Sequence, residues 1–280
     1  MRGSIEKMRT KLEAPVRYEL PIGDGAVDMN ALIGETVTLS FTGNIFCVAC
    51  GRKTKKSFNQ GHCFPCLKRL ASCDQCIVRP ELCHYHAGTC REPEWGEKFC
   101  MQPHIVYLAN SSSLKVGITR QTQVPTRWID QGAVQALPLI EVSSRYLSGL
   151  VEDLFRTWLG DRTNWRKMLK NDVETMDLLA EREKLKLLAE DGLEELRKAH
   201  PNETIHWLDS DEYTFDYPHL AWPEKAKTYN LDKTPTVEDR LIAIKGQYLI
   251  FENAALNIRK YTSYDVTISC LLYTSDAADE

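Results

Sequence analysis

The pattern of hydrophobic and polar residues predicts several short strands in the first half of the chain. Val37 to Phe41 alternates apolar and polar side chains, as a half-buried strand does. The same alternation recurs over His104 to Ala109 and over Leu114 to Arg120. The turn-forming segment Asn110 to Ser113 joins these two runs, so together they predict a hairpin. Ala136 to Val142 predicts a further strand, although it contains a proline.

Other stretches have helical spacing. Apolar residues after Ser144, a suitable N-cap residue, recur at i, i+3 and i+4, which predicts a helix with one buried side. Residues 125–131 predict a short helix that begins with proline and ends at a glycine. Leucines among Glu and Lys residues predict an amphipathic helix over 172–200. Gln247 to Phe251 alternates again, which indicates a β-rich region near the end of the chain.

These elements predict an α+β protein whose small antiparallel sheet is flanked by helices. We expect a zinc-ribbon-like Cys-rich module before this sheet and a β-rich module after it. The predicted segments are an N-terminal β element (1–46), a Cys-rich zinc-binding module (47–103), a compact strand-and-helix domain (104–170), the amphipathic helix (171–201), the β-rich C-terminal module (202–269) and a non-native tail (270–280).

The tail is set apart because Cys270 to Glu280 resembles one reading frame through a sequencing adapter. We therefore interpret it as an artefact and expect the natural C-terminus to be missing.

Composition excludes some classes of protein. Of the 280 residues, 43% are hydrophobic, and the formal net charge is −4. This hydrophobic content is enough for a packed core and excludes a fibrous or wholly disordered chain. No run approaches the roughly 18 apolar residues of a membrane span, and Met1 to Pro15 alternates charges where a signal peptide would be apolar. We expect a cytoplasmic protein without a membrane partner, whose oligomeric state stays open.

Cysteine is the unusual component, because nine of the ten cysteines lie between Cys47 and Cys100. Two Cys-x-x-Cys pairs come first, separated by twelve residues, a spacing that brings four thiolates to one tetrahedral zinc ion. Disulfides are less favoured in a reducing compartment, and an iron–sulfur cluster is a minor alternative. The predicted ligands of this first zinc site are Cys47, Cys50, Cys63 and Cys66.

A second zinc site is predicted from the cysteines that follow. The preferred ligands are Cys73, Cys76, Cys83 and Cys90, but the segment holds more donors than one ion can use. Cys100 is interpreted as a merely buried thiol. The other candidate donors are His84, His86 and His104.

The charge of the segment that holds the first two Cys-x-x-Cys pairs, here called the knuckles, suggests a binding partner. Between Cys47 and Cys73 there are six basic residues and no acidic one, with two phenylalanines interleaved, which favours contact with a phosphate backbone. The alternative is a solvated loop that offsets the negative charge of a four-thiolate zinc centre. The six residues are Arg52, Lys53, Lys55, Lys56, Lys68 and Arg69.

The domain over 104–170 contains a set of short motifs in a recognisable order. They are Ile-Val-Tyr107, Lys115-Val-Gly-Ile-Thr, Arg127, Glu152 in Gly-Leu-Val-Glu, and Asn164 before a tryptophan. In this order they resemble the GIY-YIG nuclease superfamily, and within it the phage-type branch. The whole chain, with Ile244-Lys-Gly-Gln-Tyr near its end, also resembles a bacterial family described only as a domain of unknown function.

The nuclease resemblance implies phosphodiester hydrolysis with one divalent metal ion. Glu152 would hold Mg²⁺ or Mn²⁺, and Arg127 would contact the scissile phosphate. Tyr107 would be the general base, with its pKa lowered by the metal and by Lys115. Asn164 would be a supporting polar contact.

Three functions follow as hypotheses. The first is a metal-dependent endonuclease with structural zinc, acting on nucleic acid, with DNA expected. The second is a non-catalytic zinc-containing nucleic-acid-binding protein. The third is an interaction or scaffold protein that uses the helix at 172–200.

Overall fold

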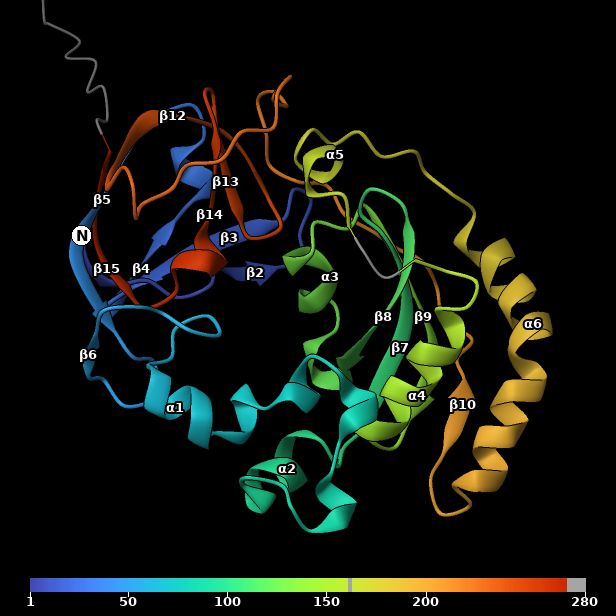
Figure 1. Cartoon of the computed structure of the whole chain (residues 1–280). Coiled ribbons are helices and arrows are strands. Elements are labelled where there is room, and N and C mark those ends of the chain that lie inside the picture. Colours follow the sequence, from blue (N-terminus) through green and yellow to red (C-terminus); the bar gives the residue numbers. More distant parts are fainter. Residues whose placement is uncertain (161–162, 271–280) are drawn as a thin grey trace, which may run out of the picture. The chain divides into compact units, whose positions relative to one another are not determined.

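The computed structural model describes residues 1–160 and 163–270, and its contacts divide the chain into two compact units (Figure 1). The first unit comprises Met1–Cys63 and the described part of Tyr217–Glu280, and the second comprises Phe64–Asp216. Both contain antiparallel sheets, and helices and strands are mixed, which confirms the predicted α+β class. Residues 271–280 of the segment interpreted as a tail lie outside the described residues.

The first unit contains a seven-stranded antiparallel sheet drawn from both ends of the chain. Its strand order is β1-β15-β5-β12-β13-β14, and β6 pairs with β5. A separate three-stranded sheet has the order β2-β3-β4. The strands are β1 (Arg2–Ser4), β2 (Arg9–Lys11), β3 (Arg17–Ile22), β4 (Gly25–Asp28), β5 (Thr36–Phe46), β6 (Lys53–Thr54), β12 (Thr236–Lys245), β13 (Tyr248–Phe251), β14 (Ala255–Asn257) and β15 (Tyr264–Cys270).

The second unit is built around a five-stranded antiparallel sheet whose central strand is β7 (His104–Asn110). β7 pairs with β8 (Leu114–Arg120) on one side and with β9 (Gln135–Val142) on the other. All seven residues of β7 are buried, so both of its faces are covered. The remaining elements are α1 (Phe64–Arg69), α2 (Pro93–Phe99), α3 (Thr126–Asp130), α4 (Arg145–Phe155), α5 (Trp165–Leu169), α6 (Leu178–Ala199), β10 (Ile205–Trp207) and β11 (Tyr213–Thr214).

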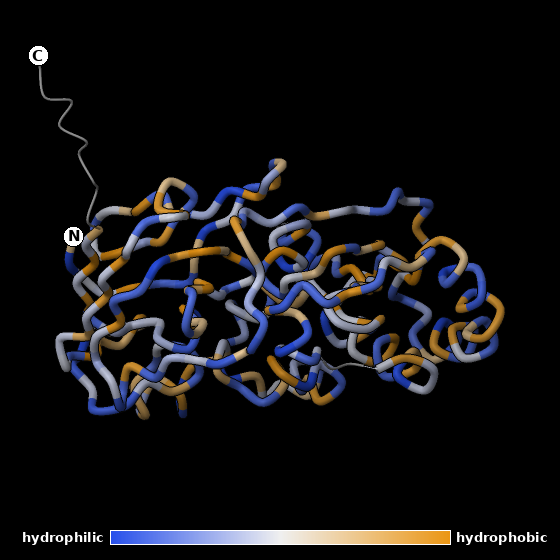
Figure 2. Tube along the Cα trace, turned by 90° about the horizontal axis from the view of Figure 1, so that it is seen from above, coloured by the Kyte–Doolittle hydropathy of each residue, from blue (hydrophilic) through white to orange (hydrophobic). Residues whose placement is uncertain are grey.

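The core of the second unit lies between one face of this sheet and two helices. Val106 and Leu108 of β7 pack in one cluster with α4 and α6. The leucine stripe expected over 172–200 contributes Leu178, Leu185 and Leu193 to the same cluster. Figure 2 shows hydrophobic and hydrophilic residues interspersed along the strands and helices. In the described ranges, 1–160 and 163–270, no helix combines the length and apolar character that crossing a bilayer requires.

α6 begins at Leu178, six residues later than the sequence pattern predicts, because tertiary contacts hold the preceding residues extended. The side chain of Asn110 donates to the carbonyl of Glu174 at 2.7 Å. Gln135 bonds both the N–H and the carbonyl of Met176. Asp177 then caps the helix by accepting from the N–H of Ala180 at 2.9 Å.

Between α1 and α2, the cysteine-rich segment of this unit forms four short 3₁₀ turns, of which η4 packs on α4. Gly149 of α4 lies so close to the turn at Pro80–Leu82 that an added Cβ would be 2.5 Å from the backbone nitrogen of Glu81. Gly149 therefore permits the turn to approach the helix. The turns are η2 (Ala71–Cys73), η3 (Gln75–Ile77), η4 (Pro80–Leu82) and η5 (Tyr85–Ala87).

We predict that Gly149→Ala and Gly192→Ala change stability in opposite directions. Both glycines are inside helices, where alanine gains about 1 kcal/mol of helix propensity. At Gly149 the new methyl group meets rigid backbone, and overpacking of this kind costs about 1–3 kcal/mol. At Gly192 it meets only the terminal atoms of Leu154, 2.8 Å away, which can turn aside.

Urea unfolding of the two variants beside the wild type measures this difference. A midpoint for Gly149→Ala at or above that of Gly192→Ala would contradict the packing of η4 on α4.

Candidate functional site

The first two Cys-x-x-Cys pairs form two tight turns. β5 ends at Phe46, and the carbonyl of Cys47 then accepts a hydrogen bond from the N–H of Gly51 at 2.8 Å. Gly51 has a φ of +68°, in the left-handed region that a glycine adopts without strain. Cys63 comes directly before α1, and Cys66 lies within that helix. Each pair therefore places two thiols on one side of a short turn.

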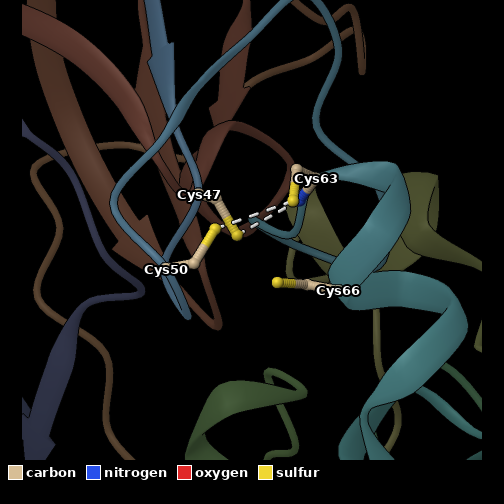
Figure 3. A group of neighbouring side chains, drawn as sticks. All are labelled: Cys47, Cys50, Cys63 and Cys66. Atoms are coloured by element: carbon tan, nitrogen blue, oxygen red, sulfur yellow. Dashed lines mark hydrogen bonds between the residues drawn. The ribbon is translucent and has the colours of Figure 1, made fainter.

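The four sulfur atoms of Cys47, Cys50, Cys63 and Cys66 lie within 4.8 Å of one another (Figure 3). Those of Cys50 and Cys63 are 3.8 Å apart. None of the four forms a disulfide, and of these four only Cys50 is exposed. In a tetrahedral site with metal–sulfur bonds of about 2.3 Å, neighbouring sulfurs are about 3.8 Å apart. The group could therefore hold a metal ion with little movement.

The backbone around Cys47 favours the thiolate that metal binding requires. Burial alone would raise the pKa of Cys47, but hydrogen bonds from the N–H groups of Cys63, Ala49 and Cys50 outweigh it and lower the pKa to about 6. The N–H of Cys63 is 3.2 Å from the sulfur of Cys47. A thiolate is stabilised when donors of this kind point at it.

The six basic residues predicted to contact nucleic acid are all exposed. Two of them lie over aromatic rings: the amine of Lys56 is 5.2 Å from the centre of Phe58, and that of Lys68 is 5.7 Å from the centre of Phe64. Phe64 itself is 53% exposed. The knuckles thus carry cations and an accessible aromatic ring, the two components that contact phosphates and bases.

The ligands predicted for a second zinc site are only partly brought together. Asp74, Cys76 and His84 have donor atoms within 4.8 Å of one another. Cys76 is also hydrogen-bonded to Cys83, and this bond is the main cause that lowers the pKa of Cys83 to about 6. Cys73 has a sulfur 4.0 Å from the hydroxyl of Ser72 and is not part of this group.

In the sheet of the second unit, Tyr107 lies against the bare backbone of Gly117. The two residues are opposite each other on β7 and β8. A Cβ on Gly117 would be 2.8 Å from both Cζ and Oη of Tyr107, so only glycine leaves room for the ring. Trp128 of α3 contacts the ring edge-on at 5.6 Å. The Tyr107 side chain is only 1% exposed.

Two side chains of the short helix α3 and the segment after it bond the phenol. Gln131 donates to the phenolic oxygen at 2.5 Å, and Arg127 also forms a hydrogen bond with Tyr107. Gln131 was not among the residues that the sequence suggested. Its position four residues after Arg127, on the same side of a helical turn, was the available signal.

Burial raises the pKa of Tyr107, and this is the largest influence on it. The charge of Arg127 and the bond from Gln131 act in the opposite direction, and the nearby carboxylate of Glu152 raises the pKa further. The resemblance to the nuclease superfamily implies that Lys115 lowers this pKa. Lys115 instead donates to the hydroxyl of Thr163 at 2.6 Å, so its amine is directed to that loop.

The structure thus brings Arg127 into contact with Tyr107 and places Glu152 near enough to raise the pKa of the phenol, whereas Lys115 bonds Thr163. Glu152 is 8% exposed and forms an ion pair at 3.2 Å with Arg156, the C-cap residue of α4. Asn164 is exposed and uses its side-chain oxygen to cap α5.

A protein-family model described as "Protein of unknown function (DUF2797)" matches residues 34–266 of the chain. The match includes the cysteine turns, the sheet around β7 and most of the C-terminal strands. No curated protein and no solved structure matches the chain.

We predict that Cys63→Ser removes one equivalent of tightly bound metal per chain, whereas Cys270→Ser removes none. Cys63 is buried among the other three thiols, and serine replaces its soft thiolate with a hydroxyl that zinc-type sites rarely use. Elemental analysis of the two purified variants, beside the wild type, measures the loss. Equal metal content in all three proteins would show that this group binds no metal.

Proposed function

Since the chain belongs to the family of proteins of unknown function DUF2797, we propose its function from its own side chains: it is a metal-dependent nucleic-acid phosphodiester hydrolase of the GIY-YIG type, with a structural zinc ion. The observation that carries the proposal is the hydrogen-bonding contact of Tyr107 with Arg127 beside the carboxylate of Glu152. A phenol, a guanidinium and a carboxylate in the order of the superfamily motifs form a set suited to one phosphate. DNA is the substrate we favour.

Arg127 is the group that meets the phosphate in this proposal. Its planar guanidinium can bond two oxygens at once, and the developing negative charge of the transition state is spread over these oxygens. Arg127 is half-buried at the start of α3. It is therefore held in place on one side by the phenol and can still contact a ligand.

Glu152 is the carboxylate that would hold Mg²⁺ or Mn²⁺. One carboxylate is a fitting donor set, because these cations keep several waters and bind substrate phosphates instead of a cage made only of protein. When bound, such an ion stabilises charge on the leaving oxygen. To bind the metal ion, Glu152 must first break its ion pair with Arg156.

Tyr107 is assigned a positioning role. A general base must lose its proton near neutral pH, but burial raises the pKa of this phenol, whose side chain is only 1% exposed. The ring fills the space over Gly117, and the oxygen fixes the side chains of Arg127 and Gln131. Tyr107 therefore acts through Arg127.

The thiols of Cys47, Cys50, Cys63 and Cys66 would hold a structural zinc ion. Four thiolates fill the tetrahedral coordination of Zn²⁺ and leave no position open for chemistry. The basic residues of this segment, together with exposed Phe64, would contact the nucleic-acid backbone and bases.

A second candidate function is nucleic-acid binding without catalysis. The burial of the Tyr107 side chain and the ion pair of Glu152 with Arg156 favour it, because both withdraw reactive groups from a ligand. For the third hypothesis, Leu178, Leu185 and Leu193 of α6 pack in the core of their own unit, whereas Leu179, Leu187 and Leu188 are exposed.

We predict that the wild-type protein nicks plasmid DNA with Mg²⁺ or Mn²⁺, and that Glu152→Ala lowers the rate by about 100-fold or more. Asp153→Ala is the matched control, since this neighbouring acid has a side chain that is 67% exposed. Gel-based nicking assays of the three proteins provide the comparison. Binding in a filter assay without cleavage by the wild type would support the second candidate, and equal loss in both variants would contradict the role of Glu152.

We predict that Tyr107→Phe lowers kcat about tenfold, because Arg127 loses one hydrogen bond of the kind worth about 1.5 kcal/mol. The phenyl ring still packs on Gly117, so the fold should be kept. The pH–rate profile should keep its shape. A general base would instead give a larger loss together with the disappearance of one limb of that profile.

A further inference from the structure

We propose that Cys76, Cys83, Cys90 and Cys100 bind a second zinc ion within the second unit. This ligand set differs from the one that the spacing of the cysteines suggests, because it includes Cys100 in place of Cys73. The inference does not depend on the proposed hydrolase activity.

The four thiols line one small cavity of about 10 Å³. A space of this size accepts about one water molecule or a bare ion. Asp74 and His84 line the same cavity, Trp95 and Gly96 close parts of its wall, and Cys73 is not among its lining residues. The cavity therefore selects four of the five cysteines between residues 73 and 100.

The thiols come from four separate turns around α2. Cys76 lies in η3, and Cys83 follows η4 directly. Cys90 and Cys100 come before and after α2, so that one ion would fasten both ends of this helix to the preceding turns. Gly96 of α2 makes room for this arrangement, since an added Cβ would be 3.4 Å from the sulfur of Cys90 and 2.9 Å from the ring of Tyr85.

A buried cation faces the same thiols. The Nε atom of Arg145 is buried and has no hydrogen-bond partner among the described residues. The backbone N–H of Arg145 donates to the carbonyl of Cys100 at 2.8 Å. Cys100 and Cys76 are close enough to the guanidinium of Arg145 to interact with it electrostatically. A zinc ion with four thiolates carries a charge of about −2, which this arginine would partly offset.

The turns of the segment bury few side chains of their own. The turns η3 and η5 contain no buried residue, and η2 and η4 bury only Ala71 and Pro80. Without an apolar core of its own, a segment of this length usually depends on a metal ion or on disulfides. All of its cysteines carry free thiols.

Asp74, Cys76 and His84 are the competing ligand set, since their donor atoms are also close together. Two of these groups already have partners. Asp74 accepts from Arg91 at 2.6 Å, and the Nδ1 atom of His84 lies 2.8 Å from the hydroxyl of Thr89. A metal ion would have to displace these contacts of Asp74 and His84. We therefore favour the four thiols as ligands.

The test is the zinc content of the full-length protein by elemental analysis. We expect two equivalents in the wild type, one in Cys100→Ser and one in Cys83→Ser. Cys73→Ser is the matched control and should keep two, as should His84→Ala. A Cys100→Ser protein with two equivalents, or a Cys73→Ser protein with one, would overturn the proposed ligand set. Loss of zinc from His84→Ala would assign the site to the competing set.

A measurement on the wild type covers the case in which a variant fails to fold. With ¹¹³Cd²⁺ in place of zinc, the protein should give two resonances in the range of four-thiolate ligation. Cys63→Ser should remove one of them and leave the other. A single four-thiolate resonance in the wild type would contradict a second site of this kind, whatever the outcome for the proposed hydrolase.

Discussion

The contact between the ring of Tyr107 and the bare backbone of Gly117 organises the polar centre of the second unit. A methyl group on Gly117 would occupy the position of the phenol, so the pairing of β7 with β8 tolerates a tyrosine here only beside a glycine. With the ring in this place, its oxygen lies within reach of Arg127 and Gln131. Side chains from β7, α3 and α4 can then act on one another, because the strand pairing has fixed one of them.

The cysteine-rich turns follow a different rule. Between Cys47 and Cys100 the chain has few buried apolar residues, and most of those that are buried are cysteines. Two groups of thiols result, one in the knuckles of the first 66 residues and one around α2. Backbone N–H donors favour the thiolate at Cys47, whereas burial raises the pKa of Cys100 to about 11 and the charge of Arg145 offsets only part of this effect.

Local features of the fold could be predicted from the sequence, whereas features set by distant residues could not. The hairpin of β7 and β8 and the cap that Ser144 gives to α4 depend only on neighbouring residues, and both are found as expected. The late start of α6 depends on Asn110 and Gln135, far away in the chain. The pKa of Tyr107 could not be read from its motif either, because its burial is a tertiary property. Likewise, the spacing of the cysteines favours Cys73 over Cys100 as a metal ligand. Only the folded structure shows that Cys100 lines the cavity and Cys73 does not.

The strand order of the first unit also governs how the chain can fold during synthesis. β5 pairs with β12 and β15, whose residues are made about two hundred positions later, while the whole second unit is one continuous stretch. The ribosome therefore completes Phe64–Asp216 before β5 meets β12 or β15. Until then β5 can pair only with β6, through its last two residues, and contacts of such long sequence separation form slowly. Premature termination after β11 would leave the inserted domain attached to an N-terminal segment whose strands β1 and β5 lack their partners β12 and β15.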